Sequence, residues 1–449
     1  MTTHIANGDT RFPASPLPDF WSRVRAFAVP AAMIETATAR RLRGDWAGAC
    51  AAAGFDVDLD LKRLVRARGR ELAARVRADL RHLAPDLLRW HLPRIAPDGL
   101  VRPGLTIALA RYEDSTDQPP LHLVVRTPPA WAGGGQRVGL ALWDGVDPTW
   151  DDPAVHPAVH PHPRPSRRFR LDLHRHLWDA RRAGELRERS GAELGPDLPP
   201  LPETERWAAE ARILLAAEGR AAGAVAVRAG ERRLVVEVGD PGCASDAGAG
   251  TRLPLLPDAA TWPPPDLELL RTGAVEPGRL HPLVAAALAP GTAPAVRAPD
   301  DPRAPRIVEC RGARHRIALV DGVLAPLDHD PAQLRREELL FALSGPPLPC
   351  LRAIDEAHRR PDCLDGVRDR IVHGDVAGAL AVVEGLLGPA AVLRHGPLRG
   401  ALHGAKAQRL AYGLYRAGLT EPPPPRLLHE HRKSVEPPSR HRPRHAFKA

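Results

Sequence analysis

Fifty prolines, spread over 449 residues, constrain the fold of this chain more than any other feature. A proline fixes its own backbone φ angle, lacks an N–H donor and disrupts the interior of a helix or a central strand. Regular elements are therefore limited to the stretches between prolines, and we expect long Pro-rich loops. The chain is also longer than one hydrophobic core usually supports, which predicts more than one packed unit.

Between the prolines, the hydrophobic pattern predicts an α+β fold with helical units at both ends of a β-containing middle. Residues 18–95 and residues 331–419 carry apolar side chains at helical spacing. Residues 100–240 contain short apolar runs bounded by proline and glycine, which are typical of strands. Within them, residues 168–178 alternate between apolar and polar types, as a half-exposed strand does.

Three further segments complete the predicted organisation. Residues 241–304 are rich in proline, glycine and alanine, which indicates a linker or surface excursion with one short helix near residues 281–289. Residues 305–330 are expected to form a β-hairpin region around Asp321-Gly322. Residues 420–449 form a basic, proline-rich tail that we expect to be disordered.

One local pattern occurs in both predicted helical units. The strings GDWAGACA at 44–51 and GDVAGALA at 374–381 are identical at six of eight positions. In each, the glycine would end one helix and the aspartate would cap the next. An Ala- and Gly-rich chain also repeats such strings by chance.

This pattern resembles the helical hairpin of tetratricopeptide-type repeats, although the regular repeat spacing and the aromatic positions of that family are absent. The resemblance implies a protein-binding role. It makes Trp46 and Val376 candidate residues of a helical-hairpin interaction surface.

Clustered arginines are the second candidate binding feature. The formal charge is +9, but only four of the 63 basic residues are lysine, as codon usage in a GC-rich genome produces. The charge is therefore weak evidence for a polyanion partner, and the arginines fit a solvated face as well. The candidate polyanion contacts are Arg167, Arg168, Arg170, Arg432, Lys433, Arg440, Arg442 and Arg444.

No motif for catalysis or cofactor binding survives inspection, so catalytic residues stay unassigned and we expect no cofactor and no metal. Residues 354–359 resemble the DEAH box of helicases, but no lysine follows a glycine, as a phosphate-binding loop requires. Asp56 and Asp58 could share one face of an extended segment, as metal-binding carboxylates do, while Asp60 fits a helix cap. The five cysteines lack the spacing of a metal knuckle.

The cysteines, the N-terminal residues and the length of the apolar runs together predict the cellular compartment of the protein. Scattered cysteines, odd in number, fit a reducing environment. The first twenty residues lack a signal pattern, and no apolar run reaches membrane-spanning length. We therefore expect a cytoplasmic protein with no membrane partner.

The whole chain, from residues 27–61 to residues 315–330, also resembles uncharacterised proteins of high-GC Gram-positive bacteria. This resemblance implies a bacterial source and supplies no activity, fold or site. Three functions follow from the sequence. The first is a non-catalytic interaction or regulatory protein whose partner is another protein. The second is a nucleic-acid-associated protein that uses the Arg-rich segments and the tail, and the third is an enzyme of unrecognised type.

Overall fold

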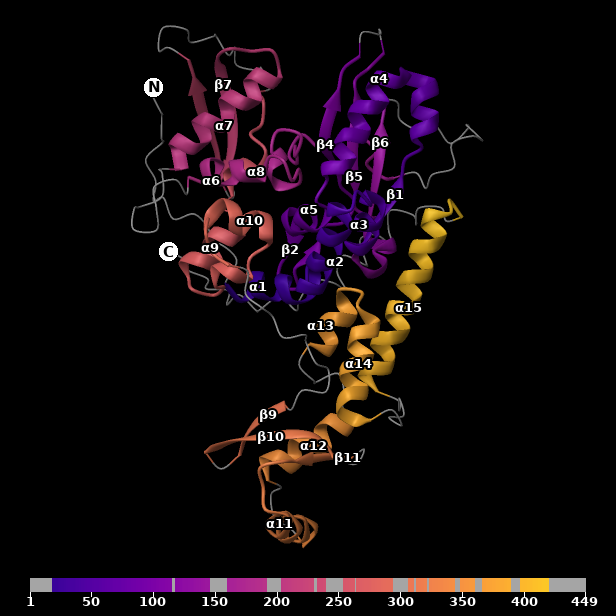
Figure 1. Cartoon of the computed structure of the whole chain (residues 1–449), viewed down its shortest axis with the longest axis vertical. Coiled ribbons are helices and arrows are strands. Elements are labelled where there is room, and N and C mark those ends of the chain that lie inside the picture. The colour runs from indigo at the N-terminus through magenta and orange to yellow at the C-terminus, as the bar shows by residue number, and fades with distance from the viewer. Residues whose placement is uncertain are drawn as a thin grey trace, which may run out of the picture.

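The computed structural model has an α+β fold, as the hydrophobic pattern predicts. It describes residues 18–114, 118–145, 160–191, 203–229, 232–239, 253–262, 264–293, 306–310, 312–320, 323–343, 348–359, 366–388 and 396–419. Figure 1 shows a broad body, formed by residues 18–293, and a narrower arm, formed by residues 306–419. No helix in the described ranges is long and apolar enough to cross a membrane.

The body is organised around a four-stranded sheet with the order β1-β6-β5-β4. Its strands are β1 (Phe55–Asp58), β4 (Thr106–Tyr112), β5 (Leu121–Arg126) and β6 (Val138–Trp143). Strand β1 runs parallel to β6, and the other neighbours are antiparallel. Because β1 lies within the segment 18–95, the predicted helical unit contributes one strand to the sheet of the β-rich unit.

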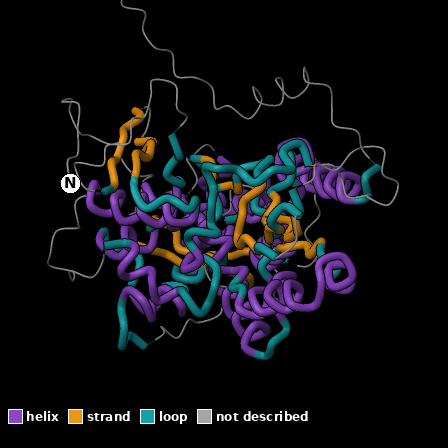
Figure 2. The backbone as a smooth tube through the Cα atoms, turned by 90° about the horizontal axis from the view of Figure 1, so that it is seen from above, coloured by secondary structure: helices purple, strands orange, loops and turns teal. Residues whose placement is uncertain are grey.

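The N-terminal segment contributes five helices to the body. They are α1 (Pro18–Arg23), α2 (Ala31–Leu42), α3 (Trp46–Ala52), α4 (Leu61–His82) and α5 (Pro85–His91). Asp60 caps α4 by accepting hydrogen bonds from the backbone N–H groups of Lys62 and Arg63, as predicted. Leu72 and Val76 of α4 are buried in the same core as the strands. Figure 2 shows helices packed around the central strands.

The predicted strand at 168–178 is wrong. Apart from one isolated bridge between Arg170 and Ala108, this segment forms turns and a short 3-10 helix (Arg175–Leu177). Its backbone groups are satisfied locally, because the N–H groups of Leu173 and His174 donate to carbonyl oxygens three residues earlier. A short helix α6 (Leu186–Arg189) and two two-residue strands, β2 (Arg94–Ile95) and β3 (Leu100–Val101), complete this part.

A second core in the body consists of one helix on a hairpin. Helix α7 (Glu203–Ala217) packs on β7 (Gly223–Ala229) and β8 (Arg232–Val238), which pair with each other in antiparallel register. Trp207 and Leu215 of the helix and Val225 of the hairpin are buried together.

The described part of the predicted linker belongs to the body core. It contains α8 (Asp258–Thr261), α9 (Pro265–Arg271) and α10 (Pro282–Leu288), of which α10 is the predicted short helix. Buried polar contacts fix these helices in place: Trp90 donates to Asp266, and His281 lies 2.8 Å from Asp86. Proline and glycine content indicated a linker here, but these long-range contacts are invisible in the local sequence.

The arm begins with three antiparallel strands in the order β11-β10-β9. They are β9 (Arg306–Cys310), β10 (Ala313–Val320) and β11 (Val323–Pro326). The helices that follow are α11 (Pro331–Leu343), α12 (Pro349–Arg359), α13 (Val367–Val372), α14 (Val376–Leu387) and α15 (Pro397–Arg416). Asp330 precedes α11 and accepts a hydrogen bond from the N–H of Ala332, as a helix cap does. Asp321-Gly322 and the tail 420–449 lie outside the described residues.

Helix α15 connects the arm to the body. Leu398, near its start, is buried in the arm core, whereas Tyr412 and Tyr415, near its end, pack with Trp131 and Ala132 of the body. Figure 1 shows α15 running upward from the arm along the edge of the body that carries β1.

Candidate functional site

The two faces of the arm sheet differ in exposure. Cys310, Ile317 and Leu324 point to the face covered by α12 and α14 and are buried in the arm core. On the opposite face Ile307 is 52% exposed and Val320 is 44% exposed. Because side chains alternate along a strand, this second face is open to solvent.

Exposed apolar side chains concentrate on the arm. Among the described residues, seven of the eleven large hydrophobic side chains that are exposed belong to it. These seven are Ile307, Val320, Leu327, Leu339, Val372, Leu410 and Leu419. Single exposed hydrophobic residues are ordinary, so it is their concentration on one part of the chain that distinguishes the arm.

The two predicted Gly-Asp turns have the same geometry. Gly44 and Gly374 have φ angles of 79° and 87°, in the left-handed region that favours glycine. The carboxylates of Asp45 and Asp375 each accept from the backbone N–H three residues later, at 2.8 and 2.9 Å. An arginine five residues before each aspartate donates to the same carboxylate. The repeat is thus a structural one at the level of the turn.

The surroundings of the two turns differ. Trp46 is half-buried against the body core, and Val376 is half-buried in the arm. Gly374 packs directly on the backbone of Gly135 in the body, while Gly44 has open space around it. The second turn therefore makes a contact within the chain, and the predicted interaction surface at Trp46 and Val376 stays a prediction.

Asp56 and Asp58 of β1 hold the end of α15 against the body. Asp56 accepts two hydrogen bonds from Arg137 and one from Tyr412, and Asp58 pairs with Arg416. Burial favours a higher pKa for Asp56, but the hydrogen bonds from Arg137 and Tyr412 outweigh it and lower the pKa. These carboxylates are occupied by cations of the protein itself, so they form a docking contact rather than an open metal site.

Two of the three described candidate polyanion contacts are engaged inside the protein. Arg168 lies 2.5 Å from Asp258, and Arg170 lies 2.7 Å from Asp172. Arg167 is exposed. The five candidates in the tail, Arg432, Lys433, Arg440, Arg442 and Arg444, lie outside the described residues. Phosphate binding at Arg168 or Arg170 would have to compete with a carboxylate already in place.

The string that resembles a DEAH box is helical. Residues 354–359 lie within α12, and Ala357 is buried in the arm core. A helicase box follows a buried strand, so this geometry does not match the nucleotide site that the string resembles.

Two hollows in the described surface have volumes of about 500 and 390 Å³. Surface residues of α2 and the following turn, including Glu35, Arg40 and Asp45, line the first, and residues of α4 line the second. Neither lining contains a cysteine, a histidine or a serine.

One cluster in the described residues combines metal-ligand types, and sequence spacing misses it. Cys310, His329 and Cys350 come from three separate segments, and their donor atoms lie within 4.8 Å of one another. Separations of 19 and 21 residues give no knuckle pattern. No protein-family model, curated protein or solved structure matches this chain.

Proposed function

We propose that this chain is a non-catalytic interaction or regulatory protein of the bacterial cytoplasm, and that its arm is the element that binds another protein. The observation that carries the proposal is the concentration of exposed apolar side chains on the arm. The buried, free thiols of Cys50, Cys310 and Cys350 are compatible with a reducing compartment.

The arm sheet supports a defined mode of binding. Strand β9 is an edge strand that pairs only with β10 among the described strands, and it carries the exposed Ile307. An exposed edge with unpaired backbone groups accepts an added strand from a partner, and neighbouring apolar side chains add affinity. Burial of a half-exposed Ile or Val contributes about 1 kcal/mol each, since full burial is worth about 1.5–3 kcal/mol.

The contacts of the other candidates favour this function over the two alternatives. The carboxylates of Asp56 and Asp58 are paired with arginines, and two of the candidate polyanion contacts are paired with carboxylates. Catalysis needs groups that converge on a space for substrate, and polyanion binding needs cations that are not already neutralised. On the open sheet face Arg316 pairs with Asp328, but the apolar side chains of Ile307 and Val320 stay exposed.

The test is capture of a partner by the full chain and by a variant with a charged arm. Ile307→Lys together with Val320→Lys places two cations on the open sheet face. Because both side chains are about half-exposed, we expect the free energy of unfolding to change by less than about 0.5 kcal/mol for each substitution. A partner that is recovered with the wild type should be lost with this variant.

The matched control is Leu42→Lys on α2, where the side chain is 75% exposed on the body. This variant should retain the partner, and calorimetry with the two purified proteins should reproduce the difference. Equal recovery by the arm variant, or failure of any partner to bind the purified wild type, would contradict the proposal.

A further inference from the structure

Three segments of the arm bring potential metal ligands together. Cys310 is the last residue of β9, His329 precedes α11, and Cys350 is the second residue of α12. Their donor atoms all lie within 4.8 Å of one another, and Nε2 of His329 lies 3.3 Å from Sγ of Cys350. Folding, rather than a local motif, creates this cluster.

The distance between His329 and Cys350 fits tetrahedral coordination of one ion. Bonds of about 2.3 Å to sulfur and about 2.0 Å to imidazole nitrogen place an S···N pair about 3.5 Å apart on one edge of a tetrahedron. The His329 to Cys350 distance of 3.3 Å is close to that edge. Two thiolates and one imidazole form a soft donor set that suits Zn²⁺ and is unsuited to Mg²⁺ or Ca²⁺.

Burial makes the cluster unusual without an ion. Cys310 and Cys350 are completely buried. A divalent cation at the centre would stabilise the two thiolates that burial alone disfavours.

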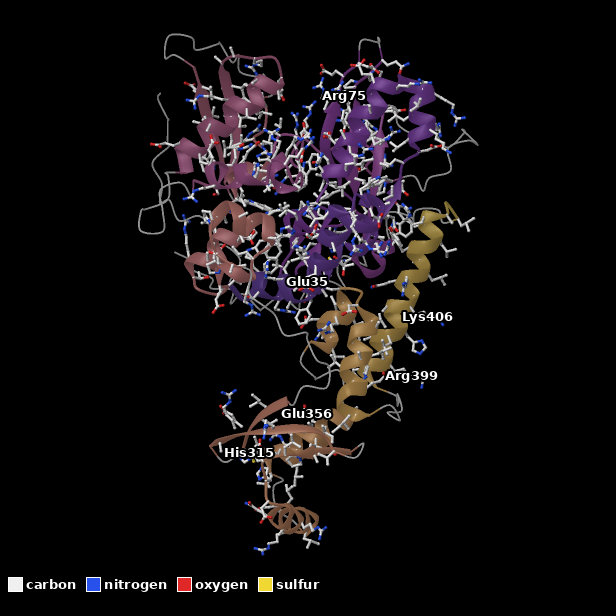
Figure 3. The ribbon with its side chains drawn as sticks, in the orientation of Figure 1. Glu35, Arg75, His315, Glu356, Arg399 and Lys406 are labelled. Atoms are coloured by element: carbon white, nitrogen blue, oxygen red, sulfur yellow. The ribbon has the colours of Figure 1, made fainter. Side chains whose placement is uncertain are left out.

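His315 provides a supporting layer. Its ring stacks on that of His329, with centroids 4.1 Å apart and planes inclined by 14°. The Nδ1 atom of His315 is buried without a hydrogen-bond partner. Figure 3 shows His315 on the arm sheet. Its stacked ring restricts the orientation of the His329 ring, as the groups around metal ligands do in zinc sites.

We propose that Cys310, His329 and Cys350 bind one zinc ion, which joins β9, the segment before α11 and α12. Binding converts two thiols to thiolates: two S–H bonds are lost, two Zn–S bonds and one Zn–N bond form, and two protons leave to solvent, with no change of oxidation state. Solvent takes the fourth coordination position, which is accessible because His329 is only half-buried. The ion would stabilise the small arm core, as metals do in small domains.

The test measures metal content and cobalt spectra of the full-length protein. Wild-type protein from zinc-containing medium should carry one zinc per chain. After chelation, Co²⁺ should restore one equivalent with the thiolate charge-transfer band and intense d–d absorption of a tetrahedral sulfur site. The single substitutions Cys310→Ala, Cys350→Ala and His329→Ala should each lower the affinity for Co²⁺ at least tenfold.

Cys50→Ala is the matched control, because Cys50 is a completely buried cysteine in the body core. It should keep full metal content. The charge-transfer band identifies thiolate ligands, because metal bound by histidine alone cannot produce it. Circular dichroism of each variant identifies misfolding, and the cobalt spectrum of the wild type decides the matter if a variant misfolds.

Two outcomes would overturn the proposal. One is absence of the thiolate band in wild-type protein, or its persistence when Cys310 and Cys350 are replaced. The other is a mass lighter by two hydrogens that returns on reduction and maps to these two cysteines, which would show a disulfide in place of the metal site.

Discussion

Two glycines with the same backbone conformation are expected to tolerate alanine very differently. At Gly44 the φ of 79° costs a side chain about 1–2 kcal/mol, and no atom lies within 4 Å of an added Cβ. At Gly374 that Cβ would lie 2.5 Å from the Cα of Gly135, which adds about 1–3 kcal/mol of overpacking. In urea unfolding followed by tryptophan fluorescence, the midpoint of Gly374→Ala should be well below that of Gly44→Ala. Equal midpoints would show that the Gly374 turn is not docked.

Because the pKa of His373 is lowered in the folded protein, we expect the free energy of unfolding to decrease in mild acid. Its Nε2 donates to the backbone oxygen of Asp98, and burial, followed by the positive charge of Arg94, lowers its pKa from 6.5 to about 4. The unfolded chain therefore binds more protons between pH 6.5 and 4. The free energy of unfolding is highest above pH 6.5 and falls towards pH 4 by at most about 1.4 kcal/mol per unit.

The measurement is the free energy of unfolding as a function of pH for wild type and His373→Gln. Glutamine keeps a donor for Asp98 but does not titrate, so the variant should show a smaller decline between pH 6.5 and 4. Burial also lowers the pKa values of His91, His160 and His176, so part of the decline should remain. His403→Gln, at an exposed position on α15, should follow the wild type. A decline of unchanged size in the His373 variant would contradict the assignment.

Among the elements, α15 provides the sharpest test of how the arm attaches. Tyr412→Phe removes the hydrogen bond to Asp56, and Arg416→Met removes the ion pair with Asp58. Tyr412→Phe leaves Asp56 with Arg137 as its remaining partner. We expect each substitution to lower the free energy of unfolding by about 1–2 kcal/mol. The ring of Trp131 packs edge-on against Tyr415, so its fluorescence reports the docking.

The control is Lys406→Met on the same helix, which changes charge without touching the body. Lys406 is exposed, and Figure 3 shows it directed away from the body. Wild-type fluorescence and stability are expected. An equal effect of all three substitutions would indicate a general change in α15 rather than loss of the contacts with β1.

At the level of elements, local chemistry was predictable and long-range contact was not. Asp60 caps α4 as predicted, because a cap depends on residues within one turn. Strand β1 escaped prediction because a short polar strand gains its stability from β6, more than 80 residues later. The cluster of Cys310, His329 and Cys350 escaped for the same reason, since each ligand belongs to a different element.

For the whole molecule, the distribution of basic residues allows us to predict which segment would bind nucleic acid. The segment 420–449 contains seven basic and three acidic residues, whereas Arg168 and Arg170 are paired within the body. Any retention of DNA or RNA in a low-salt filter-binding assay should therefore disappear when residues 420–449 are deleted and persist in Arg168→Gln/Arg170→Gln. The opposite pattern would place the contact on the body, and no retention at all would remove nucleic acid as a partner.

The bridging position of α15 has a mechanical consequence for the whole chain. Its first turns belong to the arm core, its last turns hold β1 at the edge of the main sheet, and 20 helical residues extend about 30 Å. A single helix transmits force along its axis without a joint. A load applied to the arm is therefore transmitted through α15 to β1, so that the arm and the main sheet move together.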